Sequence, residues 1–276
     1  MAQVINTNIT SLMVRRNAEE AQSGMATSME RLSSGLRINS AKDDAAGLAI
    51  ASTMTAQVRG MSQAIRNAND GISLAQTAEG ALGEVTNMLQ RIRELAVQSK
   101  SGTYSTTDRT NLQTEVAQLQ DQIDSVLTNT TFNGVTLFST TSGTDVTVTI
   151  QAGPGAADTV DLAILGIDGT TISATALDVS TTTLAGTTID NVDSALDSVN
   201  TTRASLGAGM SRLESAVTNL TNNITNLSEA RSRIEDADYS SETTAMAKAQ
   251  ILSQASTAMI AQANQAQQGV LSLIRQ

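Results

Sequence analysis

Apolar residues recur at steps of three and four along most of this 276-residue chain, and this periodicity limits the fold more than any other feature. The longest run extends from Val192 to Ile234 and is weakened only by Gly207 and Gly209. A continuous helix over residues 190–235 would be roughly 70 Å long at about 1.5 Å per residue. A compact globule of this chain length has a radius of gyration of only about 19 Å. The pattern therefore predicts an elongated rod of long antiparallel helices, with the two ends of the chain side by side.

Shorter patterns of the same kind predict three further helices, which extend over Val14–Leu32, Met54–Ala96 and Leu112–Val126. We expect a break in the second pattern near Gly71 or Gly80. Asp108 is the expected N-cap of the third, because a carboxylate accepts hydrogen bonds from the free N–H groups of a first turn. The mainly α-helical character of the chain rests on these patterns together with the long run.

The last 40 residues carry a seven-residue repeat, formed by Ala245, Leu252, Met259, Ala266 and Leu273. A sustained heptad is typical of a coiled-coil seam, here with the N-terminal helix as the partner. Ile260 and Leu271 project about 100 to 140° away from this stripe, so this helix is apolar over more than half of its circumference. One neighbour covers one stripe only. We therefore expect other copies of the chain to bury the rest, as non-closing interfaces do in a filament.

The residues expected in this polymer interface come from both ends of the chain. They are Ile5, Ile9, Leu12, Ala245, Leu252, Met259, Ile260, Ala266, Leu271 and Leu273.

Between about residues 131 and 190 the composition changes to Thr, Val, Gly and Asp. Val146, Val148 and Ile150 alternate with polar residues, which is typical of a strand. The dipeptide Asn133-Gly134 lies between short apolar segments and predicts a hairpin turn. The fold class that follows is mainly α, with a coiled-coil pair of the two chain ends and a small β-hairpin region in the middle.

The composition excludes several classes of function. The chain has no His, Cys or Trp. It therefore lacks the residues of a Ser-His or Cys-His nucleophilic site, of the usual zinc site and of a disulfide framework, and we expect no metal and no cofactor. A net charge of −10 disfavours nucleic acid and anionic lipid surfaces as partners. No apolar run is long enough to span a membrane, and the first residues do not resemble a signal peptide.

Three groups of carboxylates were considered as catalytic or calcium-binding sites, namely Asp43 with Asp44, Asp121 with Asp124, and Glu235 with Asp236 and Asp238. None has the spacing of a helix-loop-helix calcium site, and the chain has almost no aromatic surface for binding sugars. Carboxylates at helix starts and breaks suffice to explain them. We therefore expect no enzymatic activity.

Four segments resemble bacterial flagellin. They are LSSGLRINSAKDDAAGLAI (Leu32 to Ile50), ANDGISLAQTAEGAL (Ala68 to Leu82), RIRELAVQS (Arg91 to Ser99) and the stretch from Ser232 to Ile274. The resemblance implies a structural subunit of the extracellular flagellar filament, the propeller for swimming. It also implies a division into an inner-tube coiled-coil domain (1–43 with a connector, and 236–276), a rod domain (44–130 and 190–235) and a small Thr-rich β region (131–189).

The same resemblance implies several partners. These are other copies of the chain, a flagellin export chaperone at the C-terminal helix, and the hook–filament junction and filament cap proteins. Export is expected through the flagellar type III apparatus. The resemblance further implies recognition by the host Toll-like receptor for flagellin, through Arg91, Leu95 and Glu115. From periodicity alone, the favoured interpretation of two of these positions is a neighbouring helix packed on Leu95 and a solvated Arg91, and only the motif match favours a binding patch.

Two alternatives remain open. A hook–filament junction protein or a related adhesin shares the terminal helices of flagellin without building the bulk filament. An enzyme is a distant third. A further hypothesis from the resemblance is that subunits switch between alternative packings, with Gly207 and Gly209 absorbing the difference, so that Ala at either position changes filament curvature.

Overall fold

The computed structural model describes residues 7–141, 144–167 and 169–274, with the side chains of 270–274 left out. Within these residues the chain forms five helices, α1 (Ile9–Ser34), α2 (Ala45–Lys100), α3 (Thr106–Asn129), α4 (Thr182–Glu235) and α5 (Tyr239–Ile274). Two antiparallel strand pairs lie between α3 and α4, β1 (Thr131–Phe132) with β2 (Val135–Thr136), and β3 (Val146–Gln151) with β4 (Thr159–Ile164). The mainly α fold with a small β region is confirmed.

The contacts within the chain divide it into two units. The terminal unit comprises residues 1–56 and 226–276, and the central unit comprises residues 57–225. The boundary between them falls inside α2 and α4. Each unit is described by itself below.

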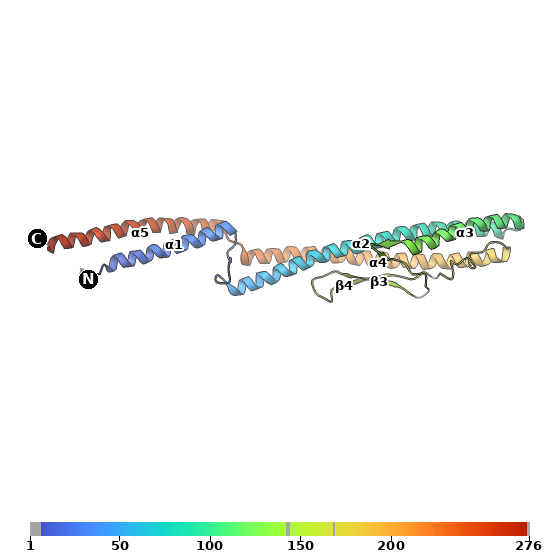
Figure 1. Ribbon diagram of the computed structural model, residues 1–276, viewed down its shortest axis with the longest axis horizontal. Helices are drawn as coiled ribbons and strands as arrows, with labels where there is room; N and C mark the ends of the chain where they lie inside the picture. The colour runs from blue at the N-terminus through green and yellow to red at the C-terminus, as the bar shows by residue number, and fades with distance from the viewer. Residues whose placement is uncertain (1–6, 142–143, 168, 275–276) are drawn as a thin grey trace. The chain divides into compact units, whose positions relative to one another are not determined.

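The terminal unit is built on α1 and α5, which lie side by side along their length (Figure 1). Gly35 ends α1 in a left-handed conformation with φ of +73°, which a residue without a Cβ adopts freely. Asp238 begins α5, since its carboxylate accepts hydrogen bonds from the N–H groups of Ser240 and Ser241. Asp44 does the same for α2, so the expected capping role of these carboxylates is confirmed.

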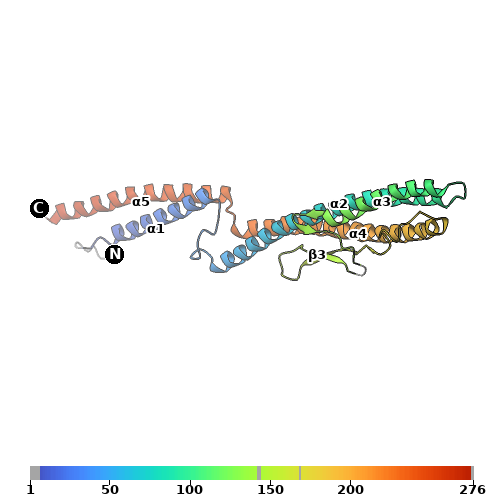
Figure 2. The ribbon, with the colours of Figure 1, turned by 45° about the vertical axis from the view of Figure 1, so that its right-hand side comes forward.

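In the central unit, parts of α2 and α4 pack with α3 around one apolar core, and β3 and β4 lie beside them (Figures 1 and 2). The largest fully buried side chains are Leu82, Leu89, Ile92, Leu95, Ile123, Leu127, Leu137, Leu162, Ile164, Ile167, Ile172 and Leu177. They come from α2 and α3, from β4 and from the segments around the strands, and α4 adds Val192, Val199 and Leu206 to the same core. Burial of this many large side chains gives the central unit a core of its own.

The strands follow the sequence prediction closely. Val146, Val148 and Ile150 alternate in burial with their neighbours along β3, and pair with Ile164, Leu162 and Val160 of β4. Asn133 and Gly134 have φ of +50° and +81° between β1 and β2, as a two-residue hairpin turn requires.

The helix boundaries differ from the prediction in three places. The helix α2 continues unbroken through Gly71 and Gly80, so the expected break is wrong. Gly71 is buried because Ile150 and Leu213 pack where its Cβ would stand. The N-cap of α3 is Ser105, and Asp108 completes a capping box three residues later, so its carboxylate stabilises the helix end without being the cap. The helix α4 begins at residue 182, eight residues before the expected start, and Thr181 Oγ1 accepts a hydrogen bond from the N–H of Leu184 in its first turn.

Candidate functional site

The interface between α1 and α5 is made of small side chains. The four buried residues on it are Ala21 and Ser28 of α1 and Ala249 and Ser256 of α5. Half-buried residues on the same face of α5 include Met246, Ser253 and Ile260. The surface that faces α1 therefore follows the heptad series of Ala249 and Ser256, and the prediction that the series of Leu252 forms the seam with the N-terminal helix is wrong.

The heptad series of Leu252 lies on the exposed side of α5. The exposed fraction of Leu252 is 48% and that of Met259 is 55%, and Ala245 and Ala266 are exposed in the same series. Ile251, beside this stripe, is 65% exposed. These exposed residues of α5 are called the outer stripe below.

The first helix also carries large apolar side chains on its surface. Ile9 and Leu12 are each 57% exposed, and Met13 and Met29 are exposed to a similar degree. Of the other expected interface positions, Ile260 is half-buried toward α1. Ile5 and the side chains of Leu271 and Leu273 lie outside the described residues.

The outer stripe also has few charges. Over its 36 residues α5 carries only Glu242 and Lys248 as charged side chains. Solvated helix faces normally carry many more, so a face this apolar and this neutral is typical of a surface that another molecule covers. Across the described residues, no helix has an apolar stretch long enough to cross a membrane.

Two of the three residues expected to contact a host receptor are close together. The guanidinium of Arg91 donates through Nη2 to Glu115 Oε1 at 2.8 Å, and through Nη1 to Glu94 Oε2 at 3.0 Å. These hydrogen bonds raise the pKa of the Arg91 guanidinium, those to Glu115 most. Leu95 is different, because it is 1% exposed and packs in the core of the central unit. Arg91 and Glu115 thus form an exposed charged pair, whereas Leu95 is buried.

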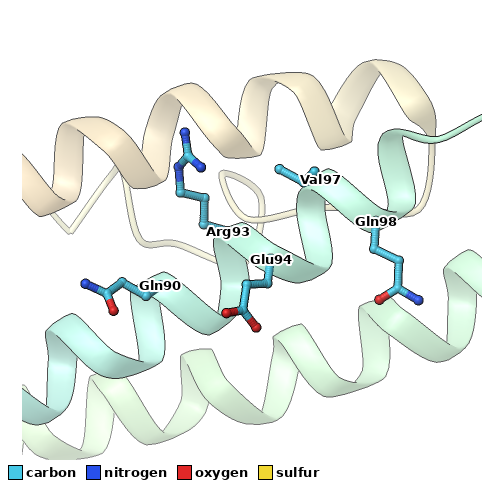
Figure 3. A pocket seen from close by; sticks show the side chains of 5 residues that line it. All are labelled: Gln90, Arg93, Glu94, Val97 and Gln98. Carbon is cyan, nitrogen blue, oxygen red and sulfur yellow. The ribbon is translucent and has the colours of Figure 1, made fainter.

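A shallow hollow of about 540 Å³ lies next to this pair on the surface of α2 (Figure 3). Its lining consists of Gln90, Arg93, Glu94, Val97 and Gln98, which follow one face of the helix. Arg93 also binds Asp193 of α4 at 2.7 Å, and this contact lowers the pKa of the Asp193 carboxyl. The lining has no nucleophile with an adjacent base, so it offers no means of catalysis. In the part of the chain that is described, no three His, Cys, Asp or Glu residues are placed to hold a metal ion.

Residues 5–143 match the bacterial flagellin N-terminal helical region, and residues 189–274 match the bacterial flagellin C-terminal helical region. The chain belongs to the bacterial flagellin family. A flagellin of Xenorhabdus nematophila is 43% identical over the whole of both chains. Flagellins are structural proteins and not enzymes, in agreement with the composition.

Other flagellins match in part. A flagellin of Salmonella muenchen is 52% identical over 179 residues, which are 65% of this chain but 35% of that protein. The chain thus spans about a third of the length of the Salmonella flagellins that it matches. The crystal structure of a Bacillus cereus flagellin is 34% identical, covers 60% of this chain and 94% of that one, and superimposes with a TM-score of 0.50. The flagellin regions flank the small β region and contain every exposed stripe described above.

Proposed function

We propose that this chain is a structural subunit that polymerises with copies of itself into the flagellar filament, the extracellular propeller of a swimming bacterium. The observation that carries the proposal is the outer stripe of α5 together with the exposed apolar residues of α1. The residues fully buried between these two helices are small, and the larger Met246 and Ile260 are only half-buried there. Membership of the flagellin family supports the same conclusion.

Self-association fits this surface better than a single foreign partner does. Apolar side chains are exposed on both α1 and α5, so a copy has two different surfaces to offer. Contact between unlike surfaces of identical subunits repeats into a helical polymer unless the rotation between subunits closes a ring. Small residues along the α1–α5 interface bury little area per copy, and repetition along a filament multiplies that area.

Seeded assembly tests the proposal directly. Purified chain is mixed with short filament fragments, and growth is measured by electron microscopy and by the pelleted fraction. We expect long uniform tubes from the wild type. We expect no growth from Leu252→Asp with Met259→Asp, because both charges would be buried without partners. The matched control is Leu184→Asp, which adds a charge to an exposed apolar residue of the central unit. It lies in the first turn of α4, where a carboxylate is favourable.

The outcomes separate the proposal from its rival. Normal growth of the Leu252 and Met259 double variant would remove the outer stripe from the interface. A wild type that stays monomeric or forms short rings on seeds would favour a hook–filament junction protein over a filament subunit.

The proposed route to the filament is export of the chain by the flagellar type III apparatus, with an export chaperone bound to α5 beforehand. Support comes from the exposure of Ile251, Leu252 and Met259, which a cytoplasmic monomer would present to other proteins. The hook–filament junction and cap proteins are the partners proposed for the two ends of the polymer. Co-purification of a chaperone that is lost in the Leu252 and Met259 double variant would test this part.

Recognition by the host Toll-like receptor for flagellin is proposed on the resemblance, with the exposed Arg91–Glu115 pair as its structural support. Reporter cells that express the receptor provide the test. We expect Arg91→Ala to reduce signalling and Arg66→Ala, another exposed arginine of α2, to leave it unchanged. Because Leu95 is buried, Leu95→Ala is expected to act through the stability of the central unit. Equal signalling by all three variants would contradict the assignment.

A further inference from the structure

The α1–α5 interface has a seven-residue repeat that leaves its register poorly defined. Its buried residues on α1, Ala21 and Ser28, are seven positions apart, and so are Ala249 and Ser256 on α5. Moving one helix along the other by seven residues in one direction therefore brings Ala21 opposite Ser256 and Ser28 opposite Ala249, so that small side chains again face small side chains. Packing alone distinguishes such registers weakly, because Ala and Ser differ little in size and contact area.

The observed register can be counted from the two ends of the helix pair. The two helices are antiparallel, since Ser28 bonds to Glu242 while Asn8 donates to the carbonyl of Ala263 at 3.3 Å. Counting between these contacts places Ala21 level with Ala249, and Val14 near Ser256. A shift of seven residues one way would place Ala21 against Ser256. A shift the other way would place Val14 against Ala249.

One polar cluster distinguishes these registers. The carboxylate of Glu242 uses both oxygens: Oε2 accepts from Ser28 Oγ at 3.0 Å, and Oε1 accepts from Arg31 Nη1 at 2.9 Å. The Glu242 side chain is 13% exposed and that of Arg31 is 30% exposed. This is the sole ion pair between α1 and α5 among the residues described. In either shifted register Glu242 loses both donors.

The helix dipoles stabilise both charged residues of the cluster. Glu242 lies in the first turn of α5, and Arg31 lies in the last turn of α1. A carboxylate at a helix N-terminus and a cation at a helix C-terminus each gain from the helix dipole. Both charges keep these positions in their own helices when one helix slides along the other, so the dipoles strengthen the cluster without selecting a register.

The backbone next to the cluster supports the same register. Gly35 accepts a hydrogen bond from the N–H of Ala237 at 2.9 Å, and the N–H of Arg37 donates to Glu235 at 2.6 Å. The guanidinium of Arg37 donates to the carbonyl of Ile234 at 2.5 Å, at the end of α4. The two connectors are thus joined beside Glu242, at the same end of the pair.

We propose that Glu242, held by Ser28 and Arg31, is a positioning residue that sets the register of α1 against α5, a task that the small-residue interface cannot perform. Buried ionic groups are best attested in this role of fixing registry. The consequence for a second copy of the chain is that the outer stripe and the exposed residues of α1 are presented at one fixed offset. This last step rests on the proposed function, whereas the register itself does not.

Because the chain has no Cys, engineered cysteine pairs report the register cleanly. Three double cysteine variants are made, each with and without Glu242→Ala. Ala21→Cys with Ala249→Cys reports the observed register. Ala21→Cys with Ser256→Cys reports one shifted register, and Val14→Cys with Ala249→Cys reports the other. A short thiol-specific crosslinker is added to the monomer, and the crosslinked fraction is read by mass spectrometry. With Glu242 intact, we expect crosslinking of the first pair only. With Glu242→Ala, we expect a several-fold gain in one of the shifted pairs.

The control is Glu19→Ala, which removes a carboxylate from an exposed pair with Arg15 within α1 and should leave all three yields unchanged. Shifted pairs that stay uncrosslinked in Glu242→Ala, while circular dichroism shows an intact helix content, would overturn the proposal. So would equal crosslinking of all three pairs with Glu242 in place.

Seeded assembly of the same variants separates the register from the proposed function. A shifted register with lost filament growth supports both. A shifted register in a chain whose wild type never forms filaments would leave the register assignment standing and would contradict the filament.

Discussion

The two units of this chain use apolar side chains in opposite ways. The central unit buries Leu, Ile and Val from three helices and a strand in one core. In the described part of the terminal unit, the buried apolar residues are Ala21, Ile38, Ala51 and Ala249, of which only Ile38 is large. Nine large apolar side chains among the same residues are exposed instead, namely Ile9, Leu12, Met13, Met29, Ile50, Tyr239, Ile251, Leu252 and Met259.

This difference separates two sources of stability. A helix bundle with large buried side chains gains most of its free energy within one chain. A pair of helices in contact through Ala and Ser buries little, and long isolated helices are marginal in water. On the proposed function, the terminal unit gains stability from other copies of the chain, through contacts at its exposed surface.

The largest expected effect comes from truncating a leucine in each unit. Leu89 is fully buried in α2, and Leu89→Ala is expected to cost about 2–5 kcal/mol of unfolding free energy of the central unit. Leu252→Ala removes the same atoms from a 48% exposed position and should change the unfolding of the monomer by about 0.5 kcal/mol or less. Urea unfolding of the monomer, followed by circular dichroism, measures both.

The assembly assay should reverse the order of these two variants. Leu252→Ala should slow filament growth, whereas Leu89→Ala should assemble at temperatures where its core is still folded. If Leu252→Ala destabilised the monomer as much as Leu89→Ala, the terminal unit would have a core of its own and the comparison would fail.

A second prediction concerns two glycines of α4 in the central unit. A Cβ at Gly209 would collide with Leu162 Cδ1 of β4, whereas a Cβ at Gly207 would meet no atom within 4 Å. Gly209→Ala should therefore cost about 1–3 kcal/mol through overpacking. Gly207→Ala should stabilise α4 by up to about 1 kcal/mol through helix propensity.

The curvature of filaments assembled from the same two variants tests the switching hypothesis. If packing between α4 and β4 absorbs the difference between subunit states, Gly209→Ala should alter curvature while Gly207→Ala should not. An unchanged waveform in both variants would count against a role for these glycines. Thermal unfolding of the monomers provides the stability measurement.

Periodicity predicted most of the fold because helices and strands bury faces at fixed spacing. The alternation of Val146, Val148 and Ile150 and the turn at Asn133-Gly134 are found as predicted. The continuity of α2 through Gly71 was not predictable, since the residues that fill the space beside it, Ile150 and Leu213, are remote in sequence. Tertiary packing there overrides the weak helix propensity of glycine.

The candidate site was predictable only in part for a related reason. The heptads of Leu252 and of Ala249 lie on adjacent faces of one helix, and sequence alone does not say which of the two faces α1. The structure places the small residues inward, where they allow close approach, and the large residues outward. The cluster of Glu242, Ser28 and Arg31 gave no sequence signal, because Glu242 is more than 200 residues away from the other two.

Helix caps provide a smaller contrast between the units. Ser105 and Asp108 form a capping box at the start of α3, and Ser105→Ala should cost about 0.5–2 kcal/mol in the unfolding of the central unit. Asp238 caps α5 in the terminal unit, and Asp238→Ala should leave that unfolding unchanged but weaken filament growth. An equal loss of monomer stability in both variants would show that α5 belongs to the same cooperative unit as α3. Urea unfolding and seeded assembly are measured on both.

The smallest expected effects come from two carboxyl groups whose pKa values are shifted in opposite directions. Hydrogen bonds from the backbone N–H groups of Ser40 and Asn39 lower the pKa of Asp43, in the terminal unit. Its contribution to stability is therefore present above the pKa of the unfolded chain, about 3.9, and is lost as the pH falls through the folded-state value. Burial, and then the nearby charge of Asp121, raise the pKa of Asp124 in the central unit. Its ionisation at neutral pH therefore opposes folding.

Two amide substitutions test these signs. Asp124→Asn should stabilise the central unit slightly at pH 7. It should have no effect below about pH 3, where the carboxyl of Asp124 is protonated in both the unfolded and the folded state. Asp43→Asn should increase hydrogen exchange of the Ser40 and Asn39 amides at pH 7 and should leave the unfolding of the central unit unchanged. A destabilising Asp124→Asn at neutral pH would mean that the carboxylate has a favourable partner in solution, and the central unit would then use charge as well as apolar burial to stabilise α3.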